Sequence, residues 1–295
     1  NIFQQKLSIP QYLGTAGSVI YGNFAKVRNH GVDLSIDYGK QISKDFTLQF
    51  KGTFTFARNK VLEYDEAPGL RPGMKTVGRR LNTFLGYVTN GLYENYTDVE
   101  ESPTSTLGNI AISPGDIKYV DQPDANGNYD GRITSDDRVE IGDPWIPEIV
   151  YGFGPSMRWK NWDFSFFFQG QTNVSLIMEN FEPFGERSAR GVLAWIADDY
   201  WSPDYPNVNA KHPRLTRLTN NHNMQVSTYW LRDASFLKLK NVELGYSYKK
   251  ARFYISGSNL LTISPFKHWD PEVGTGAGMQ YPTQRIFNLG IQMSF

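Results

Sequence analysis

Apolar and polar side chains alternate in short stretches along this chain, which predicts β-strands that each have one apolar face. The clearest stretch is 241–258, where only Lys249-Lys250 interrupts the alternation. If these two lysines form a hairpin loop, Tyr248 lies opposite Ala251 and the apolar positions of both strands share one face of the sheet. Two leucines just upstream are in the opposite phase, so we expect a β-bulge near Lys240.

Further stretches show the same period of two, at residues 32–42, 46–56, 149–159, 164–174 and 287–295, whereas residues 2–9 are too short to judge alone. The stretch 46–56 places its phenylalanines on one face over about ten residues, which is the length and character of a strand that crosses a bilayer. The side chains expected to face lipid are Phe46, Phe50, Phe54, Phe166 and Phe168.

The connections between these stretches fall into two classes. Tight turns at 43–45, 160–163 and 249–250 alternate strictly with long connections at about 10–26, 59–148, 175–235 and 264–286. Outer-membrane barrels show this asymmetry, with short periplasmic turns and long extracellular loops, and they contain an even number of strands. The pattern therefore predicts an all-β fold with eight membrane crossings. Aromatic residues beside the tight turns, at Tyr38, Trp159, Trp162, Tyr246 and Tyr248, are placed as an interfacial girdle would be.

Composition narrows the classes of function. The 295 residues carry 30 basic and 30 acidic side chains, and this zero net charge argues against a nucleic-acid partner. Without cysteine the chain has no disulfide framework and no thiolate metal site. No apolar run approaches ~18 residues, the length that a membrane-spanning helix needs. The four histidines are scattered and no catalytic motif is present, so we expect no enzymatic activity.

Several segments resemble the C-terminal half of SusC-like TonB-dependent outer-membrane transporters of Bacteroidota. They are KVRNHGVDLSIDY at 26–38, GDIKYVDQPDANGNYDGRITSDDRVEIGDPWIPEIVYGF at 115–153, WLRDASFLKLKNVELGYSY at 230–248 and ISGSNLLT from 255, with DPEV shortly after it. The resemblance implies that residues 1–295 form about the last eight strands of a 22-stranded barrel in the bacterial outer membrane, without the N-terminal plug and TonB box.

The same resemblance implies a set of partners. A SusD-like surface lipoprotein would cover the mouth of the barrel, and TonB-ExbB-ExbD would act through the missing N-terminal part. The expected function is active import of an oligomeric nutrient, a glycan or a peptide, as the barrel subunit of a SusCD-type complex.

One segment in the connection 59–148 has the spacing of a calcium-binding loop. Asn126, Asn128 and Asp130 occupy positions 1, 3 and 5 of an EF-hand-type pattern, and Asp137 occupies position 12. Arg132 stands at position 7, where the pattern uses a backbone carbonyl oxygen. Asn replaces the usual Asp at position 1, and Asp replaces the usual Glu at position 12. A Ca²⁺ site and a calcium-free turn rich in Asn and Asp are therefore both open interpretations.

Two further sets of residues are candidates for function. Trp145, Trp195, Trp201 and Trp269 lie in long connections, where their rings could stack on sugars of a substrate or pack the loops together. Phe295 follows alternating apolar residues at the end of the chain, as in the assembly signal of outer-membrane barrels.

Two other classes of protein compete with the importer. A complete eight-stranded barrel with a structural or adhesive role would fill its interior with bulky side chains, whereas the inward positions here are mostly small and polar. A soluble carbohydrate-binding β-sandwich would have to cover phenylalanine-rich faces that otherwise cause aggregation.

Overall fold

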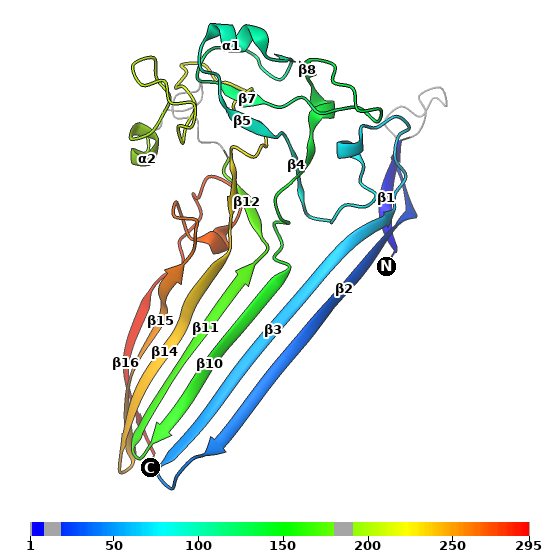
Figure 1. The fold of residues 1–295 in the computed structure, drawn as a ribbon. Coiled ribbons are helices and arrows are strands. Elements are labelled where there is room, and N and C mark those ends of the chain that lie inside the picture. Colours follow the sequence, from blue (N-terminus) through cyan, green and yellow to red (C-terminus); the bar gives the residue numbers. More distant parts are fainter. Residues whose placement is uncertain (1, 9–18, 180–190, 295) are drawn as a thin grey trace.

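The computed structural model describes residues 2–8, 19–179 and 191–294. Its main element is a single antiparallel sheet of eight long strands, in which each strand pairs with the next one along the chain (Figure 1). The eight strands are β1 (Ile2–Ser8), β2 (Val19–Gln41), β3 (Phe46–Glu63), β10 (Ile149–Trp159), β11 (Trp162–Thr172), β14 (Phe236–Tyr248), β15 (Ala251–Ile263) and β16 (Ile286–Met293). The predicted all-β fold with eight consecutive antiparallel strands is confirmed, and the described part of β1 pairs only with the outer segment 19–26 of β2.

The tight turns follow the predicted register. Tyr248 lies opposite Ala251 across the Lys249-Lys250 loop, and Trp159 lies opposite Trp162 in the preceding hairpin. In each loop the first residue, Lys249 or Lys160, has a positive φ of 51° or 52°. The expected bulge is present as a register shift between Leu239 and Asn241, which returns the upstream leucines to the apolar face.

Two strands are longer than the alternation predicts. β2 begins at Val19 rather than near residue 32, and β3 continues to Glu63, so that Lys26 pairs with Glu63. The side chains of Lys26 and Glu63 also form an exposed ion pair at 2.7 Å. Outside the bilayer both faces of a strand meet water, and the alternation of apolar and polar residues therefore ends there. The backbone hydrogen bonds between the strands do not depend on this alternation and continue beyond it. The predicted connections 10–26 and 59–148 are shorter for this reason.

The apolar positions of neighbouring strands lie directly opposite one another and therefore on one face. Phe54 pairs with Leu34 on one side and with Tyr151 on the other, and Phe168 pairs with Phe153 and Leu239. The opposite face carries charges: Arg252 donates to Asp163 at 3.0 Å and to Glu243 at 2.5 Å. Charged groups are costly in hydrocarbon, so the apolar face is the one that meets lipid and the charged face lines the lumen.

Arginine at Phe50 tests this assignment. Phe50 is the fifth residue of β3, which places it near the midplane of a strand that crosses the bilayer in about ten residues. We expect F50R to lower the free energy of unfolding by about 2–4 kcal/mol in denaturant titrations of the membrane-inserted protein. Q49R, one residue away on the lumenal face, is the matched control and should have a much smaller effect. Equal losses in both variants would contradict the assignment of faces.

The long connections emerge together at the end of the sheet opposite the tight turns, and carry the small elements (Figure 1). We call the described parts of 64–148, 173–235 and 264–285 the loop cap. Its strands are β4 (Phe84–Gly86), β5 (Thr89–Leu92), β6 (Thr104–Ser105), β7 (Ile117–Tyr119), β8 (Arg132–Ile133), β9 (Val139–Ile141), β12 (Ser175–Ile177) and β13 (Leu231–Asp233). Its helices are α1 (Tyr96–Glu101) and α2 (Ala194–Ala197), with 3₁₀ turns η2 (Pro72–Met74), η3 (Ser135–Asp137) and η4 (Pro271–Val273).

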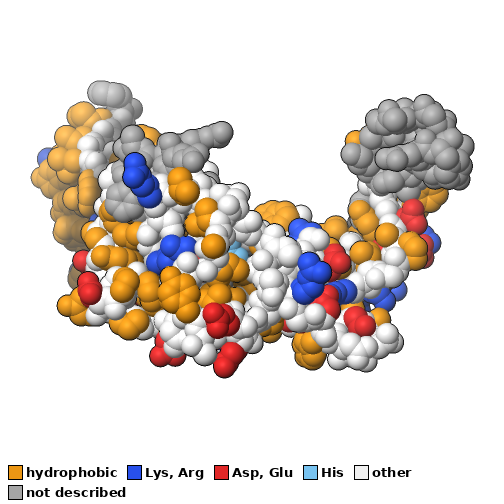
Figure 2. All heavy atoms as spheres, turned by 90° about the horizontal axis from the view of Figure 1, so that it is seen from above, with side chains coloured by type: hydrophobic (Ala, Val, Ile, Leu, Met, Phe, Trp, Pro, Cys, Tyr) orange, Lys and Arg blue, Asp and Glu red, His pale blue; other side chains and the backbone are white. Residues whose placement is uncertain are grey.

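Viewed onto the cap, the molecule forms an arc that is open on one side (Figure 2). β1 and β16 are the two edges of the sheet and pair with β2 and β15 respectively, not with each other, within the described residues. None of the helices in those residues is long and apolar enough to cross a membrane.

Candidate functional site

The three loops of the cap are joined into one body by backbone hydrogen bonds. Tyr87 N–H donates to the carbonyl of Val226 at 2.9 Å, which links the first loop to the second. Glu179 N–H donates to the carbonyl of Gly276 at 2.9 Å, which links the second loop to the third. The cap is therefore a folded layer at the mouth of the sheet rather than three independent loops.

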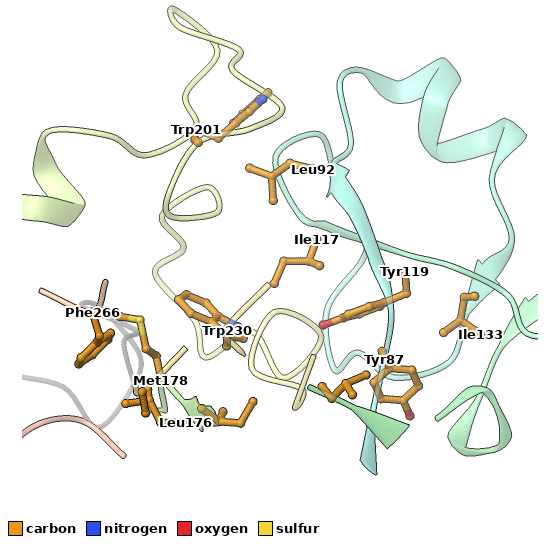
Figure 3. Close-up of a cluster of buried hydrophobic side chains, with 14 of the residues drawn as sticks. Tyr87, Leu92, Ile117, Tyr119, Ile133, Leu176, Met178, Trp201, Trp230 and Phe266 are labelled. Carbon is orange, nitrogen blue, oxygen red and sulfur yellow. The ribbon is translucent and has the colours of Figure 1, made fainter. Parts of the chain in front are cut away.

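An apolar core holds this layer together, and Figure 3 shows its side chains converging from β5, β7, β8 and β12 and from the second and third loops, which supply Trp201, Trp230 and Phe266. Ile117 and Tyr119 of β7 and Leu176 of β12 are at most 2% exposed. Burial of one such side chain stabilises a fold by about 1.5–3 kcal/mol. The cap thus has its own hydrophobic stabilisation, separate from the membrane sheet.

A buried carboxylate lies beside this core. Asp116 is fully buried, and its Oδ1 accepts hydrogen bonds from Arg214 Nε at 2.7 Å and from the side-chain amides of Asn220 and Asn223 at 2.9 Å. Its Oδ2 accepts from Arg214 Nη2 at 3.0 Å and from Ser113 N–H at 2.9 Å. The carboxylate therefore joins the first loop, which supplies Ser113, to the second loop, which supplies its other three partners. Both of its oxygens are engaged in these structural contacts.

His222 is part of the same packing rather than of a catalytic pair. It is 1% exposed, its Nε2 lies 2.7 Å from the carbonyl of Ile117, and its Nδ1 lies 3.1 Å from Ser105 Oγ. Burial lowers the pKa of the His222 imidazole, which is therefore neutral at physiological pH. A neutral ring that donates to a carbonyl and accepts from a hydroxyl serves as a structural bridge.

The four candidate tryptophans have different environments. Trp201 is 7% exposed within the cap core and presents little ring surface to a ligand. Trp195 packs on His268 with ring centroids 4.7 Å apart, and Trp269 Nε1 donates to the carbonyl of Gly274 at 3.1 Å. Trp145 is 48% exposed and is the most accessible of the four. Loop packing therefore accounts for much of this set, and substrate stacking stays a prediction. Phe295 lies outside the described residues.

The residues of the expected calcium loop do not converge as the spacing predicts. Asn126 and Asn128 are exposed, and their backbone N–H groups donate to Asp124 Oδ1 at 2.7 and 2.9 Å. Arg132 is also exposed, and its N–H donates to Asp130 Oδ1 at 2.9 Å. This end of the segment is the Asx-rich turn that the sequence left open as the alternative.

The acidic end of the segment gathers around an arginine instead. Arg71 Nη1 lies 2.6 Å from Asp137 Oδ1, and Nη2 lies 2.5 Å from Asp130 Oδ2. Asp121, which the spacing did not include, places Oδ1 3.7 Å from the same Nη1. Among the residues that the structure describes, no three His, Cys, Asp or Glu side chains are arranged to hold a metal ion. In this arrangement the acidic side chains contact a guanidinium, and calcium binding by residues 126–137 stays a prediction.

A second buried cation fixes the third loop. Lys238 of β14 is fully buried, and its Nζ lies 2.5 Å from Asp270 Oδ1 and 2.5 Å from Glu272 Oε2 at the start of η4. Lys240 adds a contact of 2.6 Å to Glu272. These contacts hold the DPEV segment against the lumenal face of the sheet.

Hollows open on the described part of the cap, and two of them carry polar groups that a ligand could contact. One of about 490 Å³ is lined by charged and amide side chains, including Glu94, Asp98 and Lys118. The other, of about 250 Å³, lies beside η4 and combines the rings of Phe266 and Trp269 with the polar groups of Asn259 and Arg285. Phe266 is only 5% exposed, so Trp269 is the aromatic side chain of this hollow that a sugar or a peptide segment could contact beside the polar groups.

Comparison with known proteins gives one family relationship, although no family model matches this chain. TonB-dependent receptor P3 of Formosa agariphila is 27% identical over 97% of this chain and 30% of its own length. TonB-dependent receptor SusC of Bacteroides thetaiotaomicron is 26% identical over 92% of this chain and 27% of its own length. This chain therefore spans about 30% of the length of the curated relatives that it matches.

Solved structures show the same fold. The RagAB peptide importer in its open-open state matches all of this chain and 31% of its own chain, with a TM-score of 0.72 and 22% identity. The RagAB peptide transporter matches 97% of this chain with a TM-score of 0.70 and 24% identity. These comparisons confirm the predicted resemblance to SusC-like TonB-dependent receptors, the barrel fold and the location in the outer membrane.

Proposed function

This chain is similar over more than nine-tenths of its length to SusC-like TonB-dependent receptors, and on this basis we propose that it forms part of the barrel of an outer-membrane importer. The protein would take up an oligomeric nutrient, a glycan or a peptide, as the barrel subunit of a SusCD-type complex. In this proposal a SusD-like lipoprotein binds over the cap, and TonB-ExbB-ExbD drives transport through another part of the protein.

The observation that carries this proposal is the separation of the molecule into a membrane sheet and a folded cap at one end. An oligomer needs a wide contact surface, and the cap supplies one above the charged lumenal face. Its aromatic hollow beside η4 and the exposed ring of Trp145 offer contact points for such a ligand. Binding sites are commonly placed on loops that a rigid scaffold positions.

The two competing classes fit the sheet less well. A complete eight-stranded barrel requires pairing between β1 and β16, which the described sheet does not contain. A β-sandwich requires a second sheet on the apolar face, whereas Leu34, Phe50 and Phe54 of that face are 36–51% exposed.

Shortening the exposed tip of each cap loop in turn tests the function. We choose residues 125–129, 203–206 and 277–281, because these tips include the exposed side chains of Tyr129, Tyr205 and Met279. In at least one variant, association with a surface lipoprotein or uptake of the nutrient should fall by about tenfold, equivalent to ~1.4 kcal/mol of binding free energy. Barrel assembly should be retained, because the strand ladder does not depend on these tips.

A substitution at the other end of the molecule is the control. K44S lies in the tight turn between β2 and β3 and should change neither association nor uptake. Normal uptake and lipoprotein association in all three shortened variants would contradict the role of the cap.

A further inference from the structure

We propose that the guanidinium of Arg71 supplies the positive charge that Asp121, Asp130 and Asp137 of the first cap loop require, in place of a divalent cation. This part of the cap is then organised without calcium. The inference concerns the folding of the cap and does not depend on what the protein transports.

Asp137 provides the first evidence. It is fully buried, and its Oδ1 accepts from Arg71 Nη1 at 2.6 Å and from Gln122 N–H at 3.1 Å. Its Oδ2 accepts from Thr134 N–H at 2.6 Å, which caps η3. A fully buried carboxylate needs a counter-charge as well as hydrogen bonds, and Arg71 supplies the only cationic contact that it makes among the described residues.

Asp121 is the third carboxylate of the cluster and the least well paired of the three. It is 6% exposed, and its Oδ2 accepts from Gly131 N–H at 2.8 Å. Its Oδ1 has no hydrogen-bond partner in the part of the chain that the structure describes and lies 3.7 Å from Arg71 Nη1. Burial raises the pKa of the Asp121 carboxyl, and the charges of Asp137 and Asp130 raise it further. The buried Oδ1 of Asp121 thus lies near the guanidinium of Arg71 but outside hydrogen-bonding distance.

The geometry of arginine explains why one side chain can serve three carboxylates. The guanidinium is a planar fork with five N–H donors, so Nη1 and Nη2 reach different acceptors. Here Nη1 donates to Asp137 and to the carbonyl of Gln122, while Nη2 donates to Asp130. The three carboxylates raise the pKa of Arg71 against the opposing effect of its burial, so it stays charged.

Arginine has a structural consequence that a free ion would not have. It is covalently part of the chain just before η2, so its contacts tie residue 71 to the segment 121–137. The departure from the calcium pattern at Asn126 removes one negative charge, whereas Asp137 keeps its charge on a shorter side chain that contacts Arg71 at 2.6 Å.

The test measures calcium dependence in the purified full-length protein in detergent. For the natural sequence, the melting temperature and the protease resistance of the cap should be the same with EDTA and with about 1 mM Ca²⁺, the range in which extracellular calcium modules bind. R71M removes the guanidinium, so that Asp121, Asp130 and Asp137 lose the cation that they share. The cap of R71M should be less stable than that of the natural sequence in EDTA, and Ca²⁺ should restore its stability. Luminescence of Tb³⁺, excited through the aromatic residues of the protein, measures cation binding directly.

Two variants serve as controls. R71M/D130N lacks one carboxylate and should bind Tb³⁺ at least about tenfold more weakly than R71M, as expected when a charged ligand is lost. R138M removes an arginine of the same loop that donates to the carbonyl of Ser135 and should gain no Tb³⁺ binding. A folded R71M that binds no Tb³⁺ would overturn the proposal. So would a calcium-dependent melting temperature in the natural sequence, whichever variants assemble.

Discussion

D116A is expected to open the loop cap while leaving the membrane sheet folded. The substitution removes the acceptor of Arg214, Asn220 and Asn223 in a fully buried position. Loss of one partner of a buried ion pair leaves an uncompensated charge and costs about 3–5 kcal/mol. Because Asp116 joins the first and second loops, this cost falls on the cap and not on the strand ladder.

Hydrogen exchange measures this effect directly. The amides of Ile117 and Tyr119 in β7 should lose protection in D116A, whereas amides of β10 and β11 should keep theirs. D199A is the matched control, since Asp199 forms a longer contact of 3.4 Å with the exposed Lys211, and such pairs contribute about 0–1 kcal/mol. Unchanged protection of β7 in D116A would show that the carboxylate does not hold the cap.

K238M is expected to release the third loop from the sheet. Lys238 is fully buried, whereas the side chains of Asp270 and Glu272 are 17% and 27% exposed and stay partly solvated after its removal. We therefore expect a cost of about 3 kcal/mol, at the lower end for a broken buried pair. Protease cleavage within 264–285 should increase. K240M removes a single, partly exposed contact and should cost about 1 kcal/mol or less.

The same contacts give the third loop a pH dependence with a defined sign. Burial opposes ionisation of Asp270 and Glu272, but hydrogen bonds from Lys238 outweigh it and hold the pKa of both carboxyls below the usual range. A carboxyl whose pKa is lower in the folded state contributes stability above its unfolded pKa of about 4 and loses it as the pH falls through the folded value. The third loop should therefore detach on acidification in the natural sequence, whereas in K238M, which lacks the cation that lowers both pKa values, protease cleavage of the loop should be high already at neutral pH and depend little on acidification. Identical acid profiles would contradict this account.

The sequence predicts the membrane sheet well because a strand with one face in lipid has a strict period of two. Tyr248 opposite Ala251 and the shift after Leu239 follow from that period alone. The outer part of β2 is missed because its two faces meet similar surroundings, and the period disappears there although the hydrogen bonds continue.

The cap is less predictable because its decisive contacts join residues far apart in the chain. Arg71 lies 66 positions from Asp137, and its segment has no pattern that predicts a partner. The acid at Asp121, five residues before Asn126, is a signal that spacing alone overlooks, since it falls outside the expected calcium pattern. Burial of Lys238 has no sequence signal either, because polar residues are expected throughout the lumenal face.

The length of β2 determines how far the sheet extends beyond the membrane on this side of the molecule. Its 23 residues extend about 75 Å at ~3.3 Å per residue, or roughly 55 Å along the membrane normal at a tilt of about 40°. The apolar band of such barrels is only about 25 Å tall, so roughly 30 Å of hydrogen-bonded sheet stands clear of the hydrocarbon. This side of the mouth is therefore bounded by a wall of hydrogen-bonded sheet, and the height of that wall is about the thickness of the hydrocarbon core. In the proposed importer, a ligand below the upper rim of this wall would be enclosed on this side before it reaches the level of the lipid.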